Sequence, residues 1–410
     1  MTAAGDQGRL EVVARVRDFQ RGWLEQTRQR AIDGRPFGIC NADEFEEILS
    51  AMGIPVLVIN PWNFMIIAQG KAAHFSQVLE SRGYSGPHFF ALGLASTMEP
   101  AEAPRGGLPK PAFVLGTTRS ESELRVTELW AREFGVPCIP IEFNLGTPSK
   151  RLPGPGWWRL TRDRWPELTD PPRLELRLAQ VNAAVATIES MTGKTLSVSR
   201  LAQTMDLVNE QVDLVAEVRG LIARARRCPV SVRDQLSLYQ PMWNRGTPVA
   251  TELFTAYRDE VADRVRNGIG AYARENYRLF YASMLEDPRF HGFLQAEFGA
   301  ALVGTPYLAA ALTYARTVYD DDPLRALIAR QLFLFANTPD WLVNEAQFLR
   351  CDGVVGIEPA SDYPSALARA CEDAGLPFIS VPGTADTDET RDRFRRYFTR
   401  LRDSSTALPN

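Results

Sequence analysis

The chain has 410 residues, 45% of them hydrophobic and 23% charged, which is enough for two or three hydrophobic cores. Its formal net charge of −4 gives no basis for nucleic-acid binding, since a phosphate-binding surface normally shows as a basic excess. Two arginine clusters, at residues 224–227 and 391–396, are therefore interpreted as solvated helix faces. The polar first residues and the interrupted apolar segment at residues 300–315 predict neither a signal peptide nor a membrane span, so a cytoplasmic location is expected.

The five cysteines lie far apart and form no C-x-x-C pair, which argues against a disulfide framework and against a zinc site. Three of them, Cys138, Cys351 and Cys371, fall on predicted buried strand or helix faces, where a small inert thiol is the usual interpretation. The cysteines therefore predict no metal site.

The first part of the chain alternates helical and extended patterns, and a polar stretch at residues 60–63 follows the first predicted strand. Asn63 lies in that stretch, at the carboxyl end of the strand, where it can contact a ligand. Asn41 or Asp43 can cap the second helix. The predicted segments are helices at residues 9–32 and 42–52, a strand at residues 55–59 and a helix at residues 64–82.

A βαβ unit is predicted at residues 112–141. A short apolar strand leads into a polar loop that ends at Glu121, and a helical stripe and a second strand follow. Gly135 stands where the glycine that ends a helix belongs. The stripe consists of Val126, Trp130 and Phe134.

A proline-, glycine- and tryptophan-rich connection at residues 146–172 predicts a crossing between domains. Helical packing segments without a catalytic signature follow it. The rest of the chain is expected to form a second α/β domain, which ends in an amphipathic helix. Its predicted segments are strands at residues 278–281 and 300–303 and helices at residues 293–298, 320–335 and 389–401; the packing helices are at residues 174–192, 198–205 and 208–227.

A second βαβ unit is predicted at residues 348–381. The polar loop after its first strand contains Glu358, Ser361 and Asp362. In open parallel sheets, ligands bind outside the carboxyl ends of the strands, so we expect this loop to contribute to a site.

The corner between helix and strand is repeated. Residues 132–139 and 372–379 share the pattern charged, x, x, Gly, apolar, Pro, x, Ile, and residues 47–58 carry a third copy of the corner. The repeats predict an α/β fold with two doubly wound, Rossmann- or flavodoxin-like parallel-sheet domains and a helical N-terminal and middle region. The expected boundaries are an N-terminal helix at residues 1–34, a first α/β domain at 35–165, a helical region at 166–270 and a second α/β domain at 271–410.

Standard catalytic motifs are missing, since the sequence has no G-x-S-x-G, no P-loop and no G-x-G-x-x-G. The three histidines are scattered. His74 and His291 lie on predicted helices, where a surface or packing role is expected. His88 follows a glycine turn beside two phenylalanines and is the histidine that we expect to lie in a site.

Several separated segments resemble the family of benzoyl-CoA reductase and 2-hydroxyacyl-CoA dehydratase subunits. Their order and spacing carry the resemblance, which covers most of the chain. The similar segments are Phe-Glu-Glu-Ile-Leu-Ser-Ala-Met-Gly-Ile-Pro-Val from residue 45, Gly-Tyr-Ser from residue 83, Pro-Lys-Pro-Ala-Phe-Val-Leu from residue 109, residues 278–307 with Phe-Gly-Ala-Ala-Leu-Val, and Asp-Gly-Val-Val from residue 352.

The resemblance implies a pair of homologous subunits in which cysteines at three strand ends hold a [4Fe–4S] cluster near a CoA thioester, with an ATP-driven activator protein that supplies electrons. This sequence departs from the family at those positions, which fall on Phe89, on residues 119–121 and on Asp362. Clusters are held by thiolates, so no cofactor is expected on this chain, and the cluster is expected in a homologous cysteine-bearing partner.

Three hypotheses stay open. The chain is a cluster-free subunit of a heteromeric dehydratase or reductase that shapes the acyl-CoA site, an enzyme with redox-independent acyl-CoA chemistry, or a non-catalytic scaffolding partner. No nucleic acid and no membrane is expected as a partner. The expected catalytic residues are His88, Glu121 and Asp362, and the expected substrate contacts are Asn63, Phe89, Arg119, Glu358 and Ser361.

Overall fold

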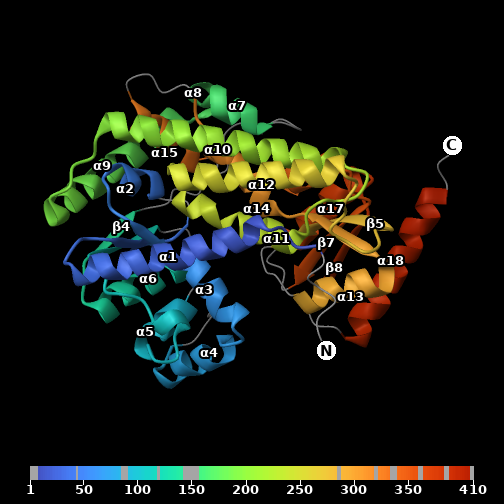
Figure 1. The fold of residues 1–410 in the computed structure, drawn as a ribbon, viewed down its shortest axis with the longest axis horizontal. Helices are drawn as coiled ribbons and strands as arrows, with labels where there is room; N and C mark the ends of the chain where they lie inside the picture. The colour runs from blue at the N-terminus through green and yellow to red at the C-terminus, as the bar shows by residue number, and fades with distance from the viewer. Residues whose placement is uncertain are drawn as a thin grey trace.

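The computed structural model describes residues 8–42, 45–84, 91–117, 121–141, 157–283, 288–317, 322–332, 339–358, 363–382 and 387–406. It contains two four-stranded sheets, in which every paired strand is parallel to its neighbour. In Figure 1 the two sheet domains lie side by side, and two long helices of the middle region, α10 and α12, run across both. The predicted fold class, two parallel-sheet α/β domains, is confirmed.

The first sheet has the order β2-β1-β3-β4. Its strands are short and almost entirely buried, as expected for a parallel sheet covered on both faces. The strands are β1 (Gly38–Cys40), β2 (Val56–Val58), β3 (Phe113–Thr117) and β4 (Cys138–Ile141), and the helices before and around them are α1 (Val12–Ile32), α2 (Glu46–Ala51), α3 (Ile59–Ala68), α4 (Ala72–Ser81), α5 (Leu92–Met98), the 3₁₀ turn η1 (Pro104–Gly106) and α6 (Glu121–Phe134).

The second sheet has the order β6-β5-β7-β8, so both domains place their strands in the order second, first, third, fourth. The C-terminal helix packs beside its last strand. The strands are β5 (Tyr277–Ala282), β6 (Ala300–Gly304), β7 (Gly353–Glu358) and β8 (Phe378–Pro382), and the helices are α13 (Pro288–Phe298), α14 (Pro306–Ala311), the 3₁₀ turn η3 (Leu312–Tyr314), α15 (Pro323–Gln331), α16 (Pro339–Phe348), α17 (Tyr363–Asp373) and α18 (Asp388–Thr406).

The middle region is helical, as predicted. Serine and threonine caps define where α10 and α12 begin, because Ser197 Oγ accepts from the N–H of Arg200 and Thr247 Oγ1 accepts from the N–H of Ala250. The helices are α7 (Trp157–Asp163), α8 (Trp165–Leu168), α9 (Pro171–Thr192), α10 (Val198–Arg224), α11 (Val232–Leu238), the 3₁₀ turn η2 (Gln240–Asn244) and α12 (Pro248–Arg266).

The repeated corner is confirmed in all three copies. Gly53, Gly135 and Gly375 follow α2, α6 and α17 with φ of 70°, 61° and 65°, the left-handed conformation that a glycine adopts without strain. No heavy atom of a neighbouring element lies within 4 Å of a Cβ built at any of the three. Glycine is therefore favoured at these turns by the backbone conformation, and not by a lack of space for a side chain.

The structure differs from the predicted elements in several places, and α5 (Leu92–Met98), α12 and α16 were not among the predicted segments. The helix predicted at residues 64–82 is two helices, α3 and α4, because Gly70 takes a φ of 71° between them. The two helices predicted at residues 198–205 and 208–227 are the single helix α10, since the intervening residues continue its turns. Strand β1 was not predicted as a separate element.

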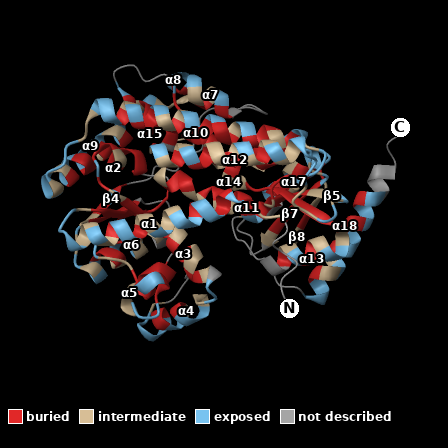
Figure 2. Cartoon of the chain, viewed as in Figure 1, coloured by how far each residue is buried: buried red, intermediate tan, exposed pale blue. Residues whose placement is uncertain are grey.

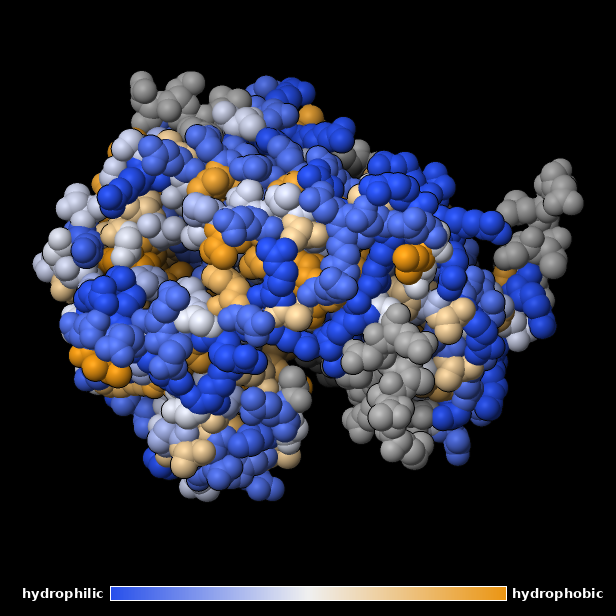
Figure 3. Space-filling view, viewed as in Figure 1, coloured by the Kyte–Doolittle hydropathy of each residue, from blue (hydrophilic) through white to orange (hydrophobic). Residues whose placement is uncertain are grey.

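One hydrophobic core runs from the first domain through the middle helices into the second domain, and a smaller core lies on the other face of each sheet. Figure 2 shows buried residues along the inner sides of α10, α12 and α14. Hydrophilic residues cover most of the visible surface in Figure 3, where an open gap separates the lower end of the first domain from the second domain. Among the described helices, none is both long enough and apolar enough to cross a membrane.

Candidate functional site

The strand order gives each sheet a switch point between its first and third strands, where the connections leave in opposite directions. In the first sheet this point lies at the carboxyl ends of β1 and β3. In the second it lies at those of β5 and β7. Ligands of open parallel sheets bind at such points, so these two edges are the first candidates for a site.

Most of the predicted site residues lie outside the described residues. These are His88, Phe89, Arg119, Ser361 and Asp362. The roles predicted for them stay predictions.

Two further predicted residues have a described backbone only. Glu121 is the first residue of α6, which follows β3, and Glu358 is the last residue of β7, paired with Pro382 of β8. Each therefore lies at or after the carboxyl end of a strand that borders a switch point, and its predicted role stays a prediction.

Asn63 is fully buried in α3, and its Oδ1 accepts a hydrogen bond of 2.8 Å from the N–H of Gly93 in α5. The two helices are close, since a Cβ at Gly93 would lie 2.7 Å from Oδ1 of Asn63. This bond gives Asn63 a role in packing α3 on α5. Its predicted contact with substrate stays a prediction.

Asn41 follows β1 directly and is 5% exposed. Within the described part of the chain its Nδ2 has no hydrogen-bond acceptor. It does not cap α2, because that helix begins after Phe45 and has no side-chain cap there. A buried amide without an acceptor, at a switch point, is a position where a ligand oxygen can bind. The sequence did not reveal this position, because β1 was not predicted and Asn41 was interpreted as a possible helix cap.

A buried ion cluster lies at the start of α2. Arg245 contacts both Glu46 and Glu47, at 3.0 Å and 2.9 Å from its Nη2, and Arg330 contacts Glu47 at 3.2 Å. All four side chains are at most 1% exposed. The Arg245 guanidinium also lies 4.4 Å from the ring centre of Tyr314. The cluster thus joins the first domain, the middle region and the second domain.

Two members of this cluster, Glu47 and Arg245, are held in their ionised forms. Burial raises the pKa of Glu47, but the guanidiniums of Arg245 and Arg330 outweigh it and bring the pKa to about 2. Burial lowers the pKa of Arg245, but Glu46 and Glu47 outweigh it and hold that pKa well above its ordinary value. Groups so far from titration near neutral pH suit a structural link better than proton transfer.

The cysteines lie at different ends of the strands. Only Cys40 is at the carboxyl end of a strand, whereas Cys138 begins β4 and Cys351 precedes β7. Cys371 is inside α17, and Cys228 lies between α10 and α11. Burial raises the pKa of Cys228 and of Cys371 to about 12 and raises the pKa of Cys138 and Cys351 as well. These thiols are therefore neutral near pH 7, and they do not converge on one edge.

A small apolar pocket lies along β2 and the first turn of α3. Its volume is about 70 Å³, room for roughly five waters. Three tryptophans line it, Trp23, Trp62 and Trp243, and Arg105 lies at it with a φ of 51°. The indole N–H of Trp243 is buried without an acceptor among the described residues. The pocket fits a ring or a short acyl chain.

The predicted roles of two histidines are confirmed. His74 lies on the surface of α4, with its Nε2 2.9 Å from Glu99, and His291 packs on α13 against Tyr281, with ring centres 5.3 Å apart. Among the described residues, no group of three or more histidine, cysteine or acidic side chains has the arrangement of a metal site.

Comparison with known families gives one match. The sequence profile of the family described as 2-hydroxyglutaryl-CoA dehydratase, D-component, matches residues 44–402, which includes both sheets except β1. No curated protein matches the chain significantly.

Proposed function

Because the chain belongs to the 2-hydroxyglutaryl-CoA dehydratase D-component family, we propose that it is the cluster-free subunit of a heteromeric enzyme that acts on acyl-CoA thioesters. In this proposal a homologous, cysteine-bearing subunit holds a [4Fe–4S] cluster, and the present chain shapes the acyl-CoA site beside it. An ATP-dependent activator would serve the partner.

The placement of the thiols carries the proposal. A [4Fe–4S] cluster takes thiolate ligands that meet at one point. Here Cys40 stands at the carboxyl edge of the first sheet, and Cys138 stands at the opposite edge of the same sheet. Burial also keeps four of the five thiols protonated by raising the pKa of each. The cysteines of this chain therefore do not fit a cluster.

Two observations support a role beside the substrate. The family description names one component of an enzyme, which supports a partner subunit. The pocket of three tryptophans lies along β2 and the first turn of α3, and its size suits a short acyl group. His88, Glu121 and Asp362 remain the proposed acid and base groups of the site.

Co-expression with a cysteine-bearing homologue tests the proposal. We expect a stable complex, since obligate interfaces commonly bury more than about 2,000 Å². The complex, and neither chain alone, should dehydrate a 2-hydroxyacyl-CoA under anaerobic conditions with an activator. Turnover by the isolated chain, or a chain that stays monomeric with the homologue, would favour an independent enzyme or a scaffold.

Two matched variants locate the cluster. Cys40→Ser removes the thiol at the carboxyl edge, and Cys138→Ser removes the one at the opposite edge. Both should leave the iron content of the complex unchanged. Loss of iron with Cys40→Ser alone would place a cluster ligand on this chain.

A further inference from the structure

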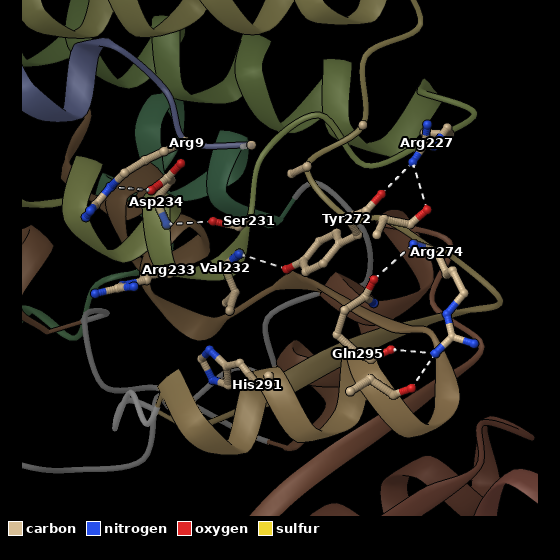
Figure 4. A pocket seen from close by; sticks show the side chains of 16 residues that line it. Arg9, Arg227, Ser231, Val232, Arg233, Asp234, Tyr272, Arg274, His291 and Gln295 are labelled. Carbon is tan, nitrogen blue, oxygen red and sulfur yellow. Dashed lines mark hydrogen bonds and ion pairs between the residues drawn. The ribbon is translucent and has the colours of Figure 1, made fainter. Parts of the chain in front are cut away.

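One pocket formed by the described residues lies away from both switch points. It has a volume of about 700 Å³, within the range of sites for small molecules. Its walls come from the segment before α1, the start of α11, the segment before β5, and α13 (Figure 4). The hydroxyl of Tyr272 bonds to the carbonyl of Leu302, so the pocket lies beside the edge strand β6.

The pocket concentrates positive charge in a chain whose formal net charge is −4. Its lining contains four arginines, Arg9, Arg227, Arg233 and Arg274, and one carboxylate, Asp234. Arg9 pairs with Asp234 at 3.5 Å. Arg227 and Arg274 lie on one side of the pocket in Figure 4, and Arg9 and Arg233 lie on the other. A ligand between the two sides would meet an excess of positive charge.

Backbone carbonyls orient two of the guanidiniums. Nη2 of Arg227 donates to the carbonyl of Tyr272, and Nη2 of Arg274 donates to the carbonyls of Gln295, at 3.2 Å, and Ala296. A carbonyl fixes the direction of a guanidinium without cancelling its charge. Each guanidinium has five N–H groups, so both keep donors for a ligand.

The walls around these arginines are tied together. The Tyr272 hydroxyl accepts from the N–H of Val232 at 3.1 Å while it donates to Leu302, which links the start of α11 to β6. Arg264 donates to the carbonyls of Gly8 and Arg9, each at 2.6 Å. The positive groups are thus held in place before a ligand arrives, which lowers the entropic cost of binding.

Close packing also fixes Arg227. A Cβ built at Gly270 would lie 2.8 Å from Nε of Arg227, so a larger residue at this position would displace the guanidinium. The segment before β5 therefore has a glycine where the arginine side chain crosses it.

We propose that this pocket binds a phosphorylated small molecule of nucleotide size that carries at least two negative charges. Arginine forks match phosphate oxygens in pairs, and arginines on facing walls suit a diphosphate. A free nucleoside diphosphate and the nucleotide end of a CoA thioester share this chemistry. The proposal does not rest on the function proposed above, and its test needs no turnover.

Calorimetric titration of the purified full chain tests the proposal. The probes are inorganic pyrophosphate, ADP and coenzyme A, with sulfate as a comparison anion. We expect at least one phosphate probe to bind with a Kd below about 1 mM at low salt and more weakly at about 0.5 M salt, because salt screens exposed charges. Equal affinity for all three probes assigns recognition to the phosphates. Tighter binding of ADP or coenzyme A than of pyrophosphate would show that the pocket also recognises the nucleoside. The tighter of these two probes then distinguishes a free nucleotide from coenzyme A as the ligand.

Matched charge variants test whether the probe binds in this pocket. Arg227→Gln and Arg274→Gln should each weaken the bound probe about tenfold or more, as expected for a lost charge-assisted contact. If either variant unfolds, Arg233→Gln is used in its place, because the side chain of Arg233 is exposed. Arg258→Gln is the control, because Arg258 lies outside the pocket on α12 and pairs with Glu217 at 2.6 Å.

Three results would overturn the proposal. They are a Kd above about 1 mM for every phosphate probe, sulfate binding as tight as pyrophosphate binding, and an Arg258→Gln effect as large as that of the pocket variants.

Discussion

The two α/β domains share one strand order, but different interactions hold the helix that follows the first strand of each sheet. In the first domain, the helix after β1 is fastened by the buried ion cluster of Glu46, Glu47, Arg245 and Arg330. In the second domain, the helix after β5 packs on α18 through aromatic rings. The same topology thus allows this helix to be held by buried charges or by aromatic rings. The ion cluster and the aromatic contacts should differ in how their contribution to stability depends on pH and on the loss of one partner.

The largest expected effect comes from Arg245→Ala. It would leave Glu46 buried without this partner and Glu47 with Arg330 alone, and breaking a buried ion pair typically costs about 3–5 kcal/mol. Urea denaturation followed by circular dichroism measures the loss. Arg258→Ala breaks an exposed pair and should cost less than about 1 kcal/mol. Equal losses in the two variants would contradict a structural role for the cluster.

Phe394→Ala tests the aromatic attachment. The ring of Phe394 is fully buried and has its centre 5.8 Å, 6.0 Å and 6.2 Å from those of Phe290, Phe293 and Phe298. We expect a loss of about 3–4 kcal/mol from the cavity and the lost ring contacts. The loss should be the same at pH 7 and pH 4, since no charge is removed. A stability loss that depends strongly on pH would contradict the difference between the two domains.

The dependence of stability on acid pH tests the ion cluster of the first domain through Glu47. The folded pKa of Glu47 is about 2, below its ordinary value of 4.5, so this group stabilises the fold fully above pH 4.5. The contribution, of the order of 3 kcal/mol, should disappear as the pH falls from 4.5 towards 2. In Glu47→Gln the unfolding midpoint should lose this part of its acid dependence. An unchanged acid slope in the variant would show that Glu47 does not carry the effect.

The smallest expected effect comes from the glycine corners between helix and strand, which both domains share. Gly53→Ala, Gly135→Ala and Gly375→Ala each place a side chain at positive φ with no neighbour within 4 Å. Each should cost about 1 kcal/mol, in either domain alike. Thermal unfolding of the three variants measures this, and Gly22→Ala, inside α1 with open space around it, is the control. Widely different losses would mean that the three corners are not equivalent.

The sequence predicted the strands and corners because their signals are local. Apolar runs mark β3 and β7, and Gly-x-Pro marks each corner. Strand β1 has three residues, too few for a period to show. Glu46 and Glu47 resemble exposed helix residues, since the arginines that bury them are about 200 or more positions away.

The site was predicted less completely than the fold. Glu121 begins the helix after β3 and Glu358 ends β7, so the backbone of each lies at a strand end, while their predicted roles stay predictions. Arg227 was interpreted as part of a solvated helix face, but it lines the pocket together with residues from three other segments. Sequence spacing cannot show such a pocket, because only folding brings those segments together.

The measurement that tests the central claim most directly is the iron and acid-labile sulfide content of the chain purified alone under anaerobic conditions. The placement of its five cysteines and the raised pKa of four of them predict less than one iron per chain and no broad visible absorption. The complex with a cysteine-bearing homologue should contain about four irons. About four irons and four sulfides in the isolated chain, with the absorption of a [4Fe–4S] cluster, would contradict the account.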